Sequence, residues 1–318
     1  MLAIQTKNLT KTYKGHGGCR DISLAVPKGS VFGLLGHNGA GKSSLVKVLV
    51  GLLHPTSGEA TILGKTLNDT YVRKKVGYLP ENFKYHDWLS GEDLLKFHGS
   101  LYGMSRTDIA DRIPKVLEYV GLQNHAHKRV GGYSKGMQQR IGIGCALINN
   151  PDLLFLDEPT SALDPIGRKV VRDLIMELKG QGKTVFINSH LLGELETICD
   201  QIAIIKDSQM IYQGNWREIS AAGYQVKVIV SGSESDIDGL QQEKFTLISQ
   251  NNELQGRKEL VFACEDDRQV PNIVKYLVQS GLEIYQVKPE TASLEKLFLH
   301  YMNDGTGLKE GSNYVYNS

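Results

Sequence analysis

The sequence predicts an α/β nucleotide-binding fold that carries an inserted helical subdomain and is followed by a small α+β domain. Three observations support this prediction. The chain reads Gly-His-Asn-Gly-Ala-Gly-Lys-Ser at residues 36–43, directly after an apolar run and before a helical pattern. Short strands of the buried type alternate with helical segments as far as about residue 218. After a break near residues 220–223, a second set of predicted strands and helices begins.

The 318-residue chain has the composition of a soluble protein with enough apolar material for two domains. Hydrophobic residues make up 41% and charged residues 22%, and the net charge is only +1. Because no overall electric field favours a polyanion, we expect no nucleic-acid partner. No apolar run approaches the roughly 20 residues of a membrane-spanning helix, and no signal peptide is recognised, so we expect no membrane segment in the chain itself.

The four cysteines lie far apart in the chain and lack the spacing of paired metal ligands; they are Cys19, Cys145, Cys199 and Cys264. Two of them fall inside segments that are predicted to be helical. We therefore expect buried, reduced thiols, and not disulfide bridges or a metal site. A cytosolic compartment fits this expectation best.

Residues 36–43 match the P-loop spacing, in which a glycine-rich turn connects a buried strand to the start of a helix. The glycines allow a tight turn with inward-facing N–H groups, and the dipole of the helix strengthens the attraction for an anion. We expect Lys42 to reach the β- and γ-phosphates of ATP and Ser43 to ligate Mg²⁺. The residues expected to contact the nucleotide here are Gly36, His37, Asn38, Gly39, Ala40, Gly41, Lys42, Ser43 and Ser44.

The segment after the P-loop is predicted to be a helix with one buried face. Its apolar residues recur at helical spacing, and Pro55 and Gly58 are expected to end it. The positions predicted to be buried are Leu45, Val48, Leu49 and Leu52. This order of strand, loop and helix is the one that a phosphate-binding loop requires.

The first domain, predicted over residues 1–218, is expected to contain a largely parallel sheet wrapped by helices. Its buried strands are predicted at Val31–Leu35, Leu153–Leu156 and Thr184–Ile187. Between them, residues 82–140 follow a helical pattern without a convincing strand, which indicates an inserted helical subdomain. The positions expected to be buried there are Leu94, Leu95, Phe97, Leu101, Val116, Leu117 and Val120.

A small α+β domain is predicted over residues 224–302. Its expected strands are Tyr224–Val230, Phe245–Ile248, Leu260–Cys264 and Leu282–Val287. Its first helix is expected to pack through Val270, Ile273, Val274, Leu277 and Val278. A last helix carries one apolar face, formed by Leu294, Leu297, Phe298 and Tyr301. Residues 303–318 are polar, and we expect them to form a flexible tail.

Two adjacent carboxylates follow the predicted strand Leu153–Leu156, at the sheet edge where open α/β sheets bind their ligands. We expect Asp157 to hold Mg²⁺, directly or through water, and Glu158 to orient or deprotonate the water that attacks the γ-phosphate. His190 follows another predicted strand and reaches the same edge, where its imidazole can hydrogen-bond the γ-phosphate. With Lys42, these residues form the predicted hydrolytic set.

Tyr13 precedes the P-loop strand, and two interpretations of it stay open. Its ring can stack on the adenine of a bound nucleotide. It can equally pack near the end of a strand without contacting a ligand, as aromatic residues commonly do.

A second motif, Tyr-Ser-Lys-Gly-Met-Gln-Gln-Arg at residues 133–140, is rarer than the P-loop. Together with the P-loop, the two carboxylates, Ser-Ala-Leu-Asp at 161–164 and the downstream histidine, it resembles the ATP-binding subunits of ABC transporters. Order and spacing match from residue 2 to about 218. The resemblance implies an ABC-type P-loop ATPase that uses ATP and Mg²⁺. It also implies that two copies pair head to tail, with Ser134 and Gly136 contacting the γ-phosphate held by the partner.

The same resemblance implies partners and a location. Subunits of this family act beneath an integral-membrane permease, so we expect a peripheral protein on the cytoplasmic side of the cell membrane, paired with a second copy. A groove near Phe83, Tyr85 and Trp88 would receive a short helix of the permease; alternatively, these aromatics form part of the subdomain core. The family usually has Gln where this chain has Glu81, so Glu81 is either a Mg²⁺ ligand or a residue that points away from the metal.

The single nucleotide domain, the variant second motif and the C-terminal domain resemble the prokaryotic branch that serves exporter-type permeases. The tripeptides at residues 36–38 and 80–82 are also similar to the ATPase of the copper-processing transporter that matures nitrous oxide reductase. Two other functions stay open, a soluble ABC-type ATPase without a permease and a nucleotide-gated regulatory module. The sequence has no heptads, paired cysteine motifs or second P-loop, which argues against the former, and its complete hydrolytic set argues against the latter.

Overall fold

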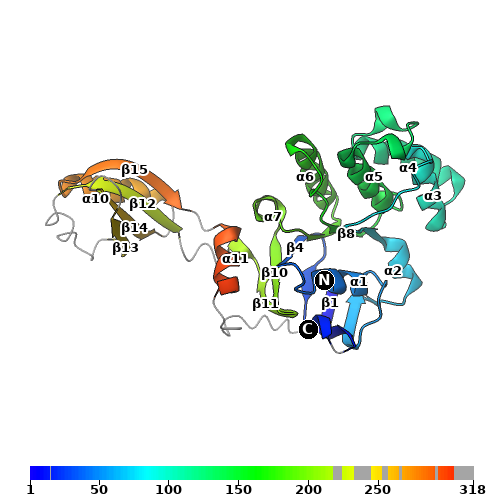
Figure 1. Cartoon of the computed structure of the whole chain (residues 1–318), viewed down its shortest axis with the longest axis horizontal. Helices are drawn as coiled ribbons and strands as arrows, with labels where there is room; N and C mark the ends of the chain where they lie inside the picture. Colours follow the sequence, from blue (N-terminus) through cyan, green and yellow to red (C-terminus); the bar gives the residue numbers. More distant parts are fainter. Residues whose placement is uncertain are drawn as a thin grey trace. The chain divides into compact units, whose positions relative to one another are not determined.

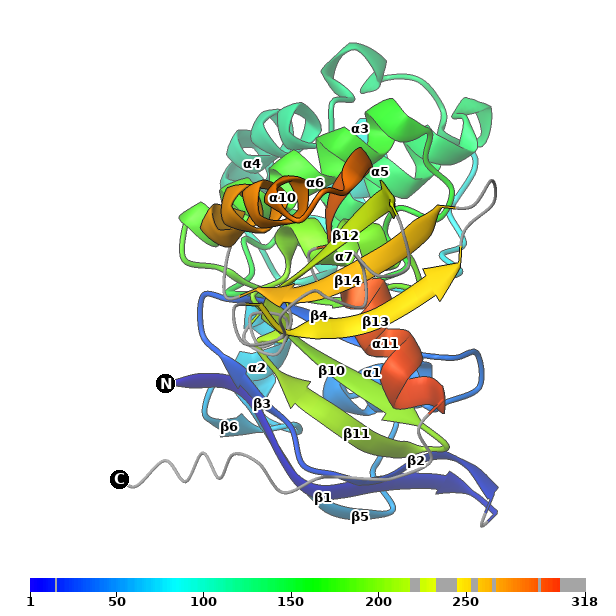
Figure 2. The same cartoon turned by 90° about the vertical axis from the view of Figure 1, so that its left-hand side faces the viewer.

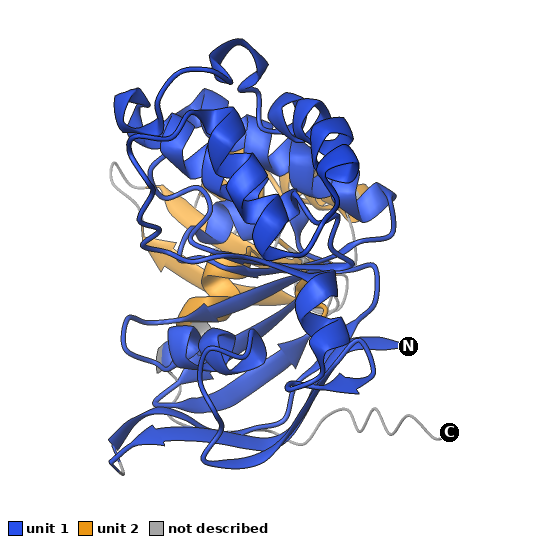
Figure 3. Cartoon of the chain, turned by 90° about the vertical axis from the view of Figure 1, so that its right-hand side faces the viewer, with its two compact units in different colours: residues 1–214, 301–318 blue, residues 215–300 orange. Residues whose placement is uncertain are grey.

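The computed structural model describes residues 1–14, 16–217, 224–232, 245–252, 257–264, 267–290 and 293–303. Figure 1 shows the elements of the chain. They form two units, one of residues 1–214 and 301–318 and one of residues 215–300 (Figure 3). The predicted break near residues 220–223 and the predicted tail beyond Asn303 lie outside the described residues.

The first unit is built on a six-stranded sheet. Its strands are β4 (Val31–Gly36), β7 (Val76–Leu79), β8 (Leu153–Asp157), β9 (Thr184–Asn188), β10 (Gln201–Lys206) and β11 (Gln209–Gly214). They lie in the order β11-β10-β4-β9-β8-β7, and only the edge strand β11 runs antiparallel to its neighbour. Every residue of β4, β8 and β9 is buried, which explains the apolar runs in their sequences.

This sheet confirms the α/β prediction, and its register sets the position of the candidate site. Leu34 of β4 and Asp157 of β8 both pair with Asn188 of β9. On the other side of β4, Gly36 pairs with Ile205 of β10. Because parallel strands all end at the same edge of a sheet, the segments that follow β4, β8 and β9 meet there.

A second sheet, which was not predicted from the sequence, shares a core with the first. Its strands are β1 (Leu2–Tyr13), β2 (His16–Ile22), β3 (Ala25–Pro27), β5 (Ser57–Ile62) and β6 (Lys65–Thr66). All of its strand pairs are antiparallel. The first three residues of β5 are exposed, and Asn8 interrupts β1 with a φ of 49°. Short or interrupted strands with many polar residues have little apolar periodicity, so their sequences do not reveal them.

Helix α1 (Lys42–Leu49) follows the P-loop and packs in the core that the two sheets share. Three of its four predicted apolar positions are buried. The helix ends earlier than predicted, because Gly51 adopts a φ of 77° and its N–H closes the last turn on the carbonyl oxygen of Val48. Leu52 therefore lies outside the helix and is 62% exposed, so the predictions of its burial and of a helix end at Pro55 were wrong.

The stretch predicted to be helical contains α3 (Gly91–Leu101), α4 (Arg106–Tyr119) and the start of α5 (Lys135–Leu147). Before it, the short helix α2 (Thr70–Lys75) leads into β7. A serine side chain caps each of the three longer helices by accepting a backbone N–H of the first turn; these serines are Ser90, Ser105 and Ser134.

Burial in this region follows the prediction at five of seven positions, which are Leu94, Leu95, Val116, Leu117 and Val120. Phe97 and Leu101 of α3 are 40% and 68% exposed, so their predicted burial was wrong. The buried side of α3 runs through Gly99, where a Cβ would lie 2.8 Å from Ile109 of α4. Phe97 lies off this side and packs instead against the ring of His86, with centroids 5.3 Å apart.

Two further helices follow the strands that end at the site. Helix α6 (Pro165–Gly180) comes after β8, and α7 (Leu192–Ile198) comes after β9 (Figure 1). The side chain of Asp164 caps α6 by accepting the N–H of Gly167 at 2.7 Å.

The second unit contains a four-stranded antiparallel sheet and the helix α10 (Val270–Gln279) (Figure 2). Its strands are β12 (Tyr224–Ser231), β13 (Leu247–Asn252), β14 (Lys258–Cys264) and β15 (Glu283–Glu290). Ile273 and Leu277 of α10 lie in the core of this unit. Val278 is 57% exposed, so its predicted packing against the core was wrong.

The last described helix, α11 (Leu294–Asn303), buries Leu294 and Leu297. Within the first unit, Nζ of Lys206 donates to the carbonyl oxygen of Met302 in the last turn of α11 at 2.7 Å. All four cysteines are buried thiols, as the sequence predicts. Among the described helices, none is both long enough and apolar enough to cross a membrane.

Candidate nucleotide-binding and hydrolysis site

The P-loop joins β4 to α1 through residues 37–41 and requires glycine at both ends. A Cβ on Gly36 would lie 2.4 Å from the carbonyl oxygen of Ile205, and one on Gly41 would lie 2.1 Å from that of Gly18. Gly41 also adopts a φ of 104°, which residues with a side chain rarely do. Neighbouring strands therefore set the path of the loop, and only glycine fits at these two positions.

The start of α1 is the anion-binding end of a helix. The residue that flanks it is a glycine, so no side chain caps it. The first-turn N–H groups of Lys42, Ser43 and Ser44 are consequently left to bind an anion, supported by the positive end of the helix dipole. The N–H of Ala40 donates to the carbonyl oxygen of His37 at 3.2 Å, which curves the loop.

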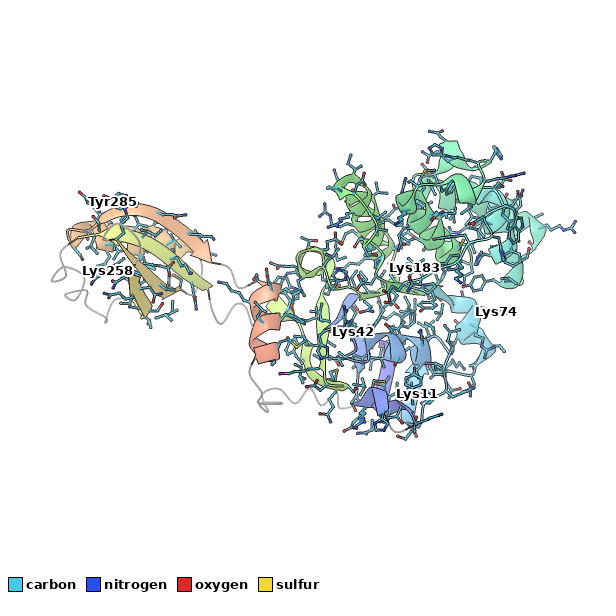
Figure 4. The ribbon with its side chains drawn as sticks, in the orientation of Figure 1. Lys11, Lys42, Lys74, Lys183, Lys258 and Tyr285 are labelled. Atoms are coloured by element: carbon cyan, nitrogen blue, oxygen red, sulfur yellow. The ribbon has the colours of Figure 1, made fainter. Side chains whose placement is uncertain are left out.

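Lys42 is a buried cation, only 7% exposed, inside the first unit (Figure 4). Its Nζ donates to two P-loop carbonyl oxygens, at 2.8 and 3.1 Å. Burial lowers the pKa of Lys42, while the carboxylates of Glu158, Asp157 and Glu81 oppose that shift. An ammonium held in this way, beside a glycine loop, is suited to bind phosphate oxygens.

Asp157 is the last residue of β8 and is 2% exposed. Nδ2 of Asn188, the last residue of β9, donates to its Oδ1 at 2.5 Å. Burial raises the pKa of Asp157; the hydrogen bond from Asn188 opposes this, and the negative charges of Glu81 and Glu158 add to it. Asn188 was not predicted as a site residue, although a polar residue at the end of an otherwise apolar buried strand is a usable signal.

Glu158 and His190 are in direct contact. Oε2 of Glu158 lies 2.8 Å from Nδ1 of His190, and Oε1 accepts the backbone N–H of His190 at 3.1 Å. The N–H of Glu158 donates to the carbonyl oxygen of Asn188 at 2.8 Å. Glu158 adopts a φ of 51°, an uncommon conformation for a residue with a side chain, which is typical of functional positions.

Tyr13 and His37 lie beside the P-loop with exposed side chains. The hydroxyl of Tyr13 is 3.3 Å from Oγ of Ser44, and the residue is 47% exposed. Nδ1 of His37 is 2.7 Å from the carbonyl oxygen of Asn38, and its Nε2 is 3.7 Å from Oδ1 of Asp207. The structure therefore brings Tyr13 to the nucleotide loop.

Glu81 follows β7 and is exposed. Its negative charge acts on Lys42 and Asp157, so it belongs to the same charged edge of the sheet. It also acts on Tyr78, whose pKa is raised to about 12, chiefly by burial and further by Asp157 and Glu81. The site thus contains three carboxylates around one buried ammonium.

Ser134 and Gly136 line a different groove, at the start of α5. Oγ of Ser134 accepts the N–H of Met137 at 3.3 Å. A Cβ on Gly136 would lie 3.3 Å from a methyl group of Leu163, so the two sides of the groove approach each other closely at Gly136. The opposite side is formed by the loop before α6 and by α6 itself, and none of the described lining residues belongs to the P-loop.

The residues at the sheet edge fit a triphosphate with Mg²⁺. A Cβ at Gly41 would collide with the backbone of Gly18 and displace the glycine loop, and the ammonium of Lys42 is buried beside that loop. Ser43 at the start of α1 and Asp157 at the end of β8 supply a hydroxyl and a carboxylate, which are oxygen ligands of the kind that Mg²⁺ prefers.

Comparison with known proteins agrees with this geometry. A family model described as ABC transporter matches residues 19–161. An ABC transporter ATP-binding protein of Synechocystis is 42% identical over 222 residues, which span 69% of this chain and 63% of that protein. YxlF of Bacillus subtilis, also an ABC transporter ATP-binding protein, is 36% identical over 94% of this chain and 98% of its own length. The bacitracin transport ATP-binding protein BcrA of Bacillus licheniformis is 31% identical over 95% of this chain and 98% of its own length.

Solved structures are similar to about two thirds of this chain. The ATP-binding subunit of an ABC transporter gives a TM-score of 0.64 at 29% identity over 69% of this chain and 92% of its own. The structure of cbiO1 of Clostridium perfringens, part of the transporter complex cbiONQ, gives a TM-score of 0.62 at 27% identity. The match covers 69% of this chain and 91% of cbiO1. A dimeric ATP-binding cassette in a post-hydrolysis state with ADP and Pi gives a TM-score of 0.61 at 27% identity. The match covers 67% of this chain and 98% of that cassette. The chain therefore belongs to the ABC transporter ATP-binding proteins, a family of ATP hydrolases.

Proposed function

We propose that this protein supplies the energy for transport through a separate integral-membrane permease. In this proposal, two copies of the chain pair around ATP and Mg²⁺ on the cytoplasmic side of the membrane. The observation that carries the proposal is the convergence of Lys42, Asp157, Glu158 and His190 at one sheet edge. Residues 1–218 form the proposed ATPase domain, and residues 82–140 its helical subdomain. Residues 224–302 form the proposed accessory domain.

In this proposal, the P-loop and α1 bind the phosphates of ATP. Lys42 contacts the β- and γ-phosphate oxygens, and the N–H groups from Gly39 to Ser44 surround them. Ser43 and Asp157 would hold Mg²⁺, which would offset the negative charge of the phosphates. Tyr13 contributes a ring face next to the adenine, in keeping with its exposure beside the loop.

Glu158 is the proposed general base. Its carboxylate takes the proton of the water that attacks the γ-phosphate, and its position is held by the two contacts with His190. Because Nδ1 of His190 faces Glu158, Nε2 is the ring atom that is available to the γ-phosphate. Glu81 adds a third negative charge near the metal and is the proposed additional Mg²⁺ contact.

The groove at Ser134 and Gly136 is the proposed contact with the nucleotide of the partner copy. Its lining residues come from a helix start and contain Lys135 and Arg140 as well as the serine and glycine. A helix start with these donors suits an anion. Since the groove contains no P-loop residue among those described, a complete site requires two copies in head-to-tail pairing.

The proposed permease contact is the aromatic segment before α3. Phe83 packs against Tyr85 with ring centroids 4.6 Å apart, and both are partly buried. Trp88 is 69% exposed and packs on His86, which also contacts Phe97. Exposed apolar rings that gather on one surface are typical of protein interfaces. A short helix of the permease is the proposed occupant.

Export is the proposed direction of transport. The relative BcrA, whose name assigns it to bacitracin transport, matches 95% of this chain and 98% of its own length. A match of this extent includes the second unit. The alternative of an ATPase without a permease lacks a specific observation in its favour.

The proposal is tested with the variant Glu158→Gln. We expect this variant to bind ATP normally, to lose at least a hundredfold in hydrolysis rate, and to accumulate as an ATP-dependent dimer in light scattering with Mg·ATP. A hydrolysis rate equal to that of the wild type, or a monomer at every concentration, would contradict the proposal.

Pairing across the composite site is tested by mixing two inactive variants. Lys42→Ala disables the P-loop, and Gly136→Glu places a negative charge in the proposed phosphate-facing groove. One intact site forms only in the mixed dimer, so we expect the mixture to hydrolyse ATP while each variant alone does not. Gly136→Ala, which adds bulk without charge, is the matched control and should retain more activity than Gly136→Glu. Association with a membrane permease is tested separately by co-purification from membranes.

A further inference from the structure

The loop of residues 159–164 directly follows Glu158 and leads into α6, and contacts hold it at both ends. Its first half contacts α7 through Thr160, and its second half contacts α6 through the carbonyl of Leu163. Residues 162–164 also line the groove that contains Ser134 and Gly136. The loop therefore connects the proposed general base to the proposed contact with the partner copy.

Thr160 is joined to α7 by a hydrogen bond to a carboxylate. The residue is 5% exposed, and its hydroxyl donates to Oε2 of Glu194 at 2.5 Å. Glu194 lies in the first turn of α7, four residues beyond His190 in the sequence. A buried hydroxyl and a carboxylate form a short, charge-assisted bond. This bond therefore ties the loop that begins after Glu158 to the helix that begins after His190.

Arg168 of α6 completes this group of side chains. Its Nη1 lies 3.5 Å from Oε1 of Glu194, and its Nε donates to the carbonyl oxygen of Leu163 at 3.1 Å. One carboxylate oxygen of Glu194 thus faces Thr160 and the other faces Arg168. A cavity of about 20 Å³ lies beside the three side chains, with room for a single water molecule.

We propose that Glu194 is a positioning residue for ATP hydrolysis, acting through Thr160 and Arg168. It holds the loop after Glu158 and the helix after His190 at the separation that the direct Glu158–His190 contact requires. The φ of 51° at Glu158 costs free energy, and such a conformation persists only where the surroundings constrain it. The Thr160–Glu194 bond supplies that constraint close to the strained residue. This inference rests on the roles proposed above for Glu158 and His190.

The test compares two substitutions of Thr160. Thr160→Val removes the hydroxyl and keeps the shape of the side chain, whereas Thr160→Ser keeps the hydroxyl. We expect Thr160→Val to lower kcat roughly tenfold to a hundredfold, with KM and the Kd for ATP unchanged, and Thr160→Ser to stay near the wild-type rate. Glu194→Ala should lower kcat in the same range. The double variant should lose little more than the worse single variant, because both changes break one linkage.

Asp173→Asn is the matched control, since it removes an exposed carboxylate from α6, the helix that carries Arg168. It should leave kcat unchanged. Thermal unfolding and ATP binding are measured for each variant, and the near-isosteric Thr160→Val decides the matter if Glu194→Ala is poorly folded.

Two results would overturn the positioning role. One is a wild-type kcat in both Thr160→Val and Glu194→Ala, and the other is an equal loss in Thr160→Ser and Thr160→Val. Glu158→Gln, measured in parallel, separates this inference from the proposed function. If Glu158→Gln is inactive while the Thr160 and Glu194 variants are fully active, only the inference fails. If Glu158→Gln is fully active, the proposed function fails.

Discussion

Oε2 of Glu158 lies 2.8 Å from Nδ1 of His190, while the backbone N–H of the same histidine donates to Oε1 of Glu158 at 3.1 Å. The backbone contact is a hydrogen bond to one carboxylate oxygen, and the imidazole ring approaches the other oxygen through Nδ1. Each residue thereby fixes the orientation of the other. The side chain of His190 is 59% exposed, whereas that of Glu158 is 12% exposed.

We expect His190→Ala to lower kcat for ATP hydrolysis about a hundredfold with a much smaller change in the Kd for ATP. The substitution removes both the proposed contact with the γ-phosphate and one of the two contacts that hold the Glu158 carboxylate. Steady-state phosphate release and nucleotide-binding fluorescence measure the two quantities. A kcat within twofold of the wild type would show that the imidazole takes no part in the reaction.

Two glycines of the P-loop should respond differently to alanine. A Cβ on Gly41 would lie 2.1 Å from the carbonyl oxygen of Gly18, whereas a Cβ on Gly39 would meet nothing within 4 Å. Both have positive φ values, so Gly39→Ala should cost about 1–2 kcal/mol of backbone strain. Gly41→Ala should cost more and also displace the start of α1. Chemical denaturation and ATP titration check this order, and equal losses in the two variants would contradict it.

Asp157→Asn should stabilise the nucleotide-free protein at neutral pH while abolishing hydrolysis. Burial raises the pKa of Asp157, so its favourable contribution to folding is complete below its ordinary value of 3.8 and is lost as the pH rises through the raised value. At pH 7 the folded protein therefore contains an unfavourable buried charge. Its removal should increase the free energy of unfolding by on the order of 1 kcal/mol.

The pH dependence gives this prediction its control. The stability difference between Asp157→Asn and the wild type should be largest near neutral pH and should shrink towards zero below about pH 4, where the carboxyl is protonated in both states. Urea denaturation across this range measures it. A difference of the opposite sign, or one that grows on acidification, would show that burial does not dominate at Asp157.

Tyr85→Phe should lower stability by about 1 kcal/mol, because the Tyr85 hydroxyl donates to the carbonyl oxygen of Gln138 in α5. The ring itself is retained, so its contact with Phe83 should persist. Tyr71→Phe, at an exposed tyrosine of α2, is the matched control and should be neutral. Thermal unfolding compares the two variants. A Tyr85→Phe protein as stable as its control would indicate that the hydrogen bond contributes nothing.

The parts of the candidate site that could be predicted from the sequence are those set by short segments. The P-loop is recognised because its glycines, Lys42 and Ser43 lie within eight consecutive residues. Asp157 and Glu158 are recognised because they end a run of apolar residues. Asn188 was missed because its role depends on its pairing with Asp157 of the neighbouring strand. The register of that pairing cannot be read from the sequence of either strand alone.

Helix ends and exposed faces show the same limit. The end of α1 at Leu49 depends on Gly51 in a left-handed conformation, which periodicity does not reveal. Phe97 and Leu101 have helical spacing with Leu94, yet the buried side of α3 is decided by its close approach to α4 at Gly99. The antiparallel sheet was missed because its strands bury too few residues to leave a pattern.

By itself, the sequence determined the α/β class, the phosphate-binding loop, the adjacent carboxylates and the family, since these rest on short runs of consecutive residues and on the order of those runs along the chain. Only the tertiary structure decided which distant groups meet: Glu158 with His190, Asp157 with Asn188, and Thr160 with Glu194. The physical reason is that these contacts follow from strand register and from the packing of loops and helices against the sheet. Burial energies summed over the whole unit set that packing, and no local pattern encodes it.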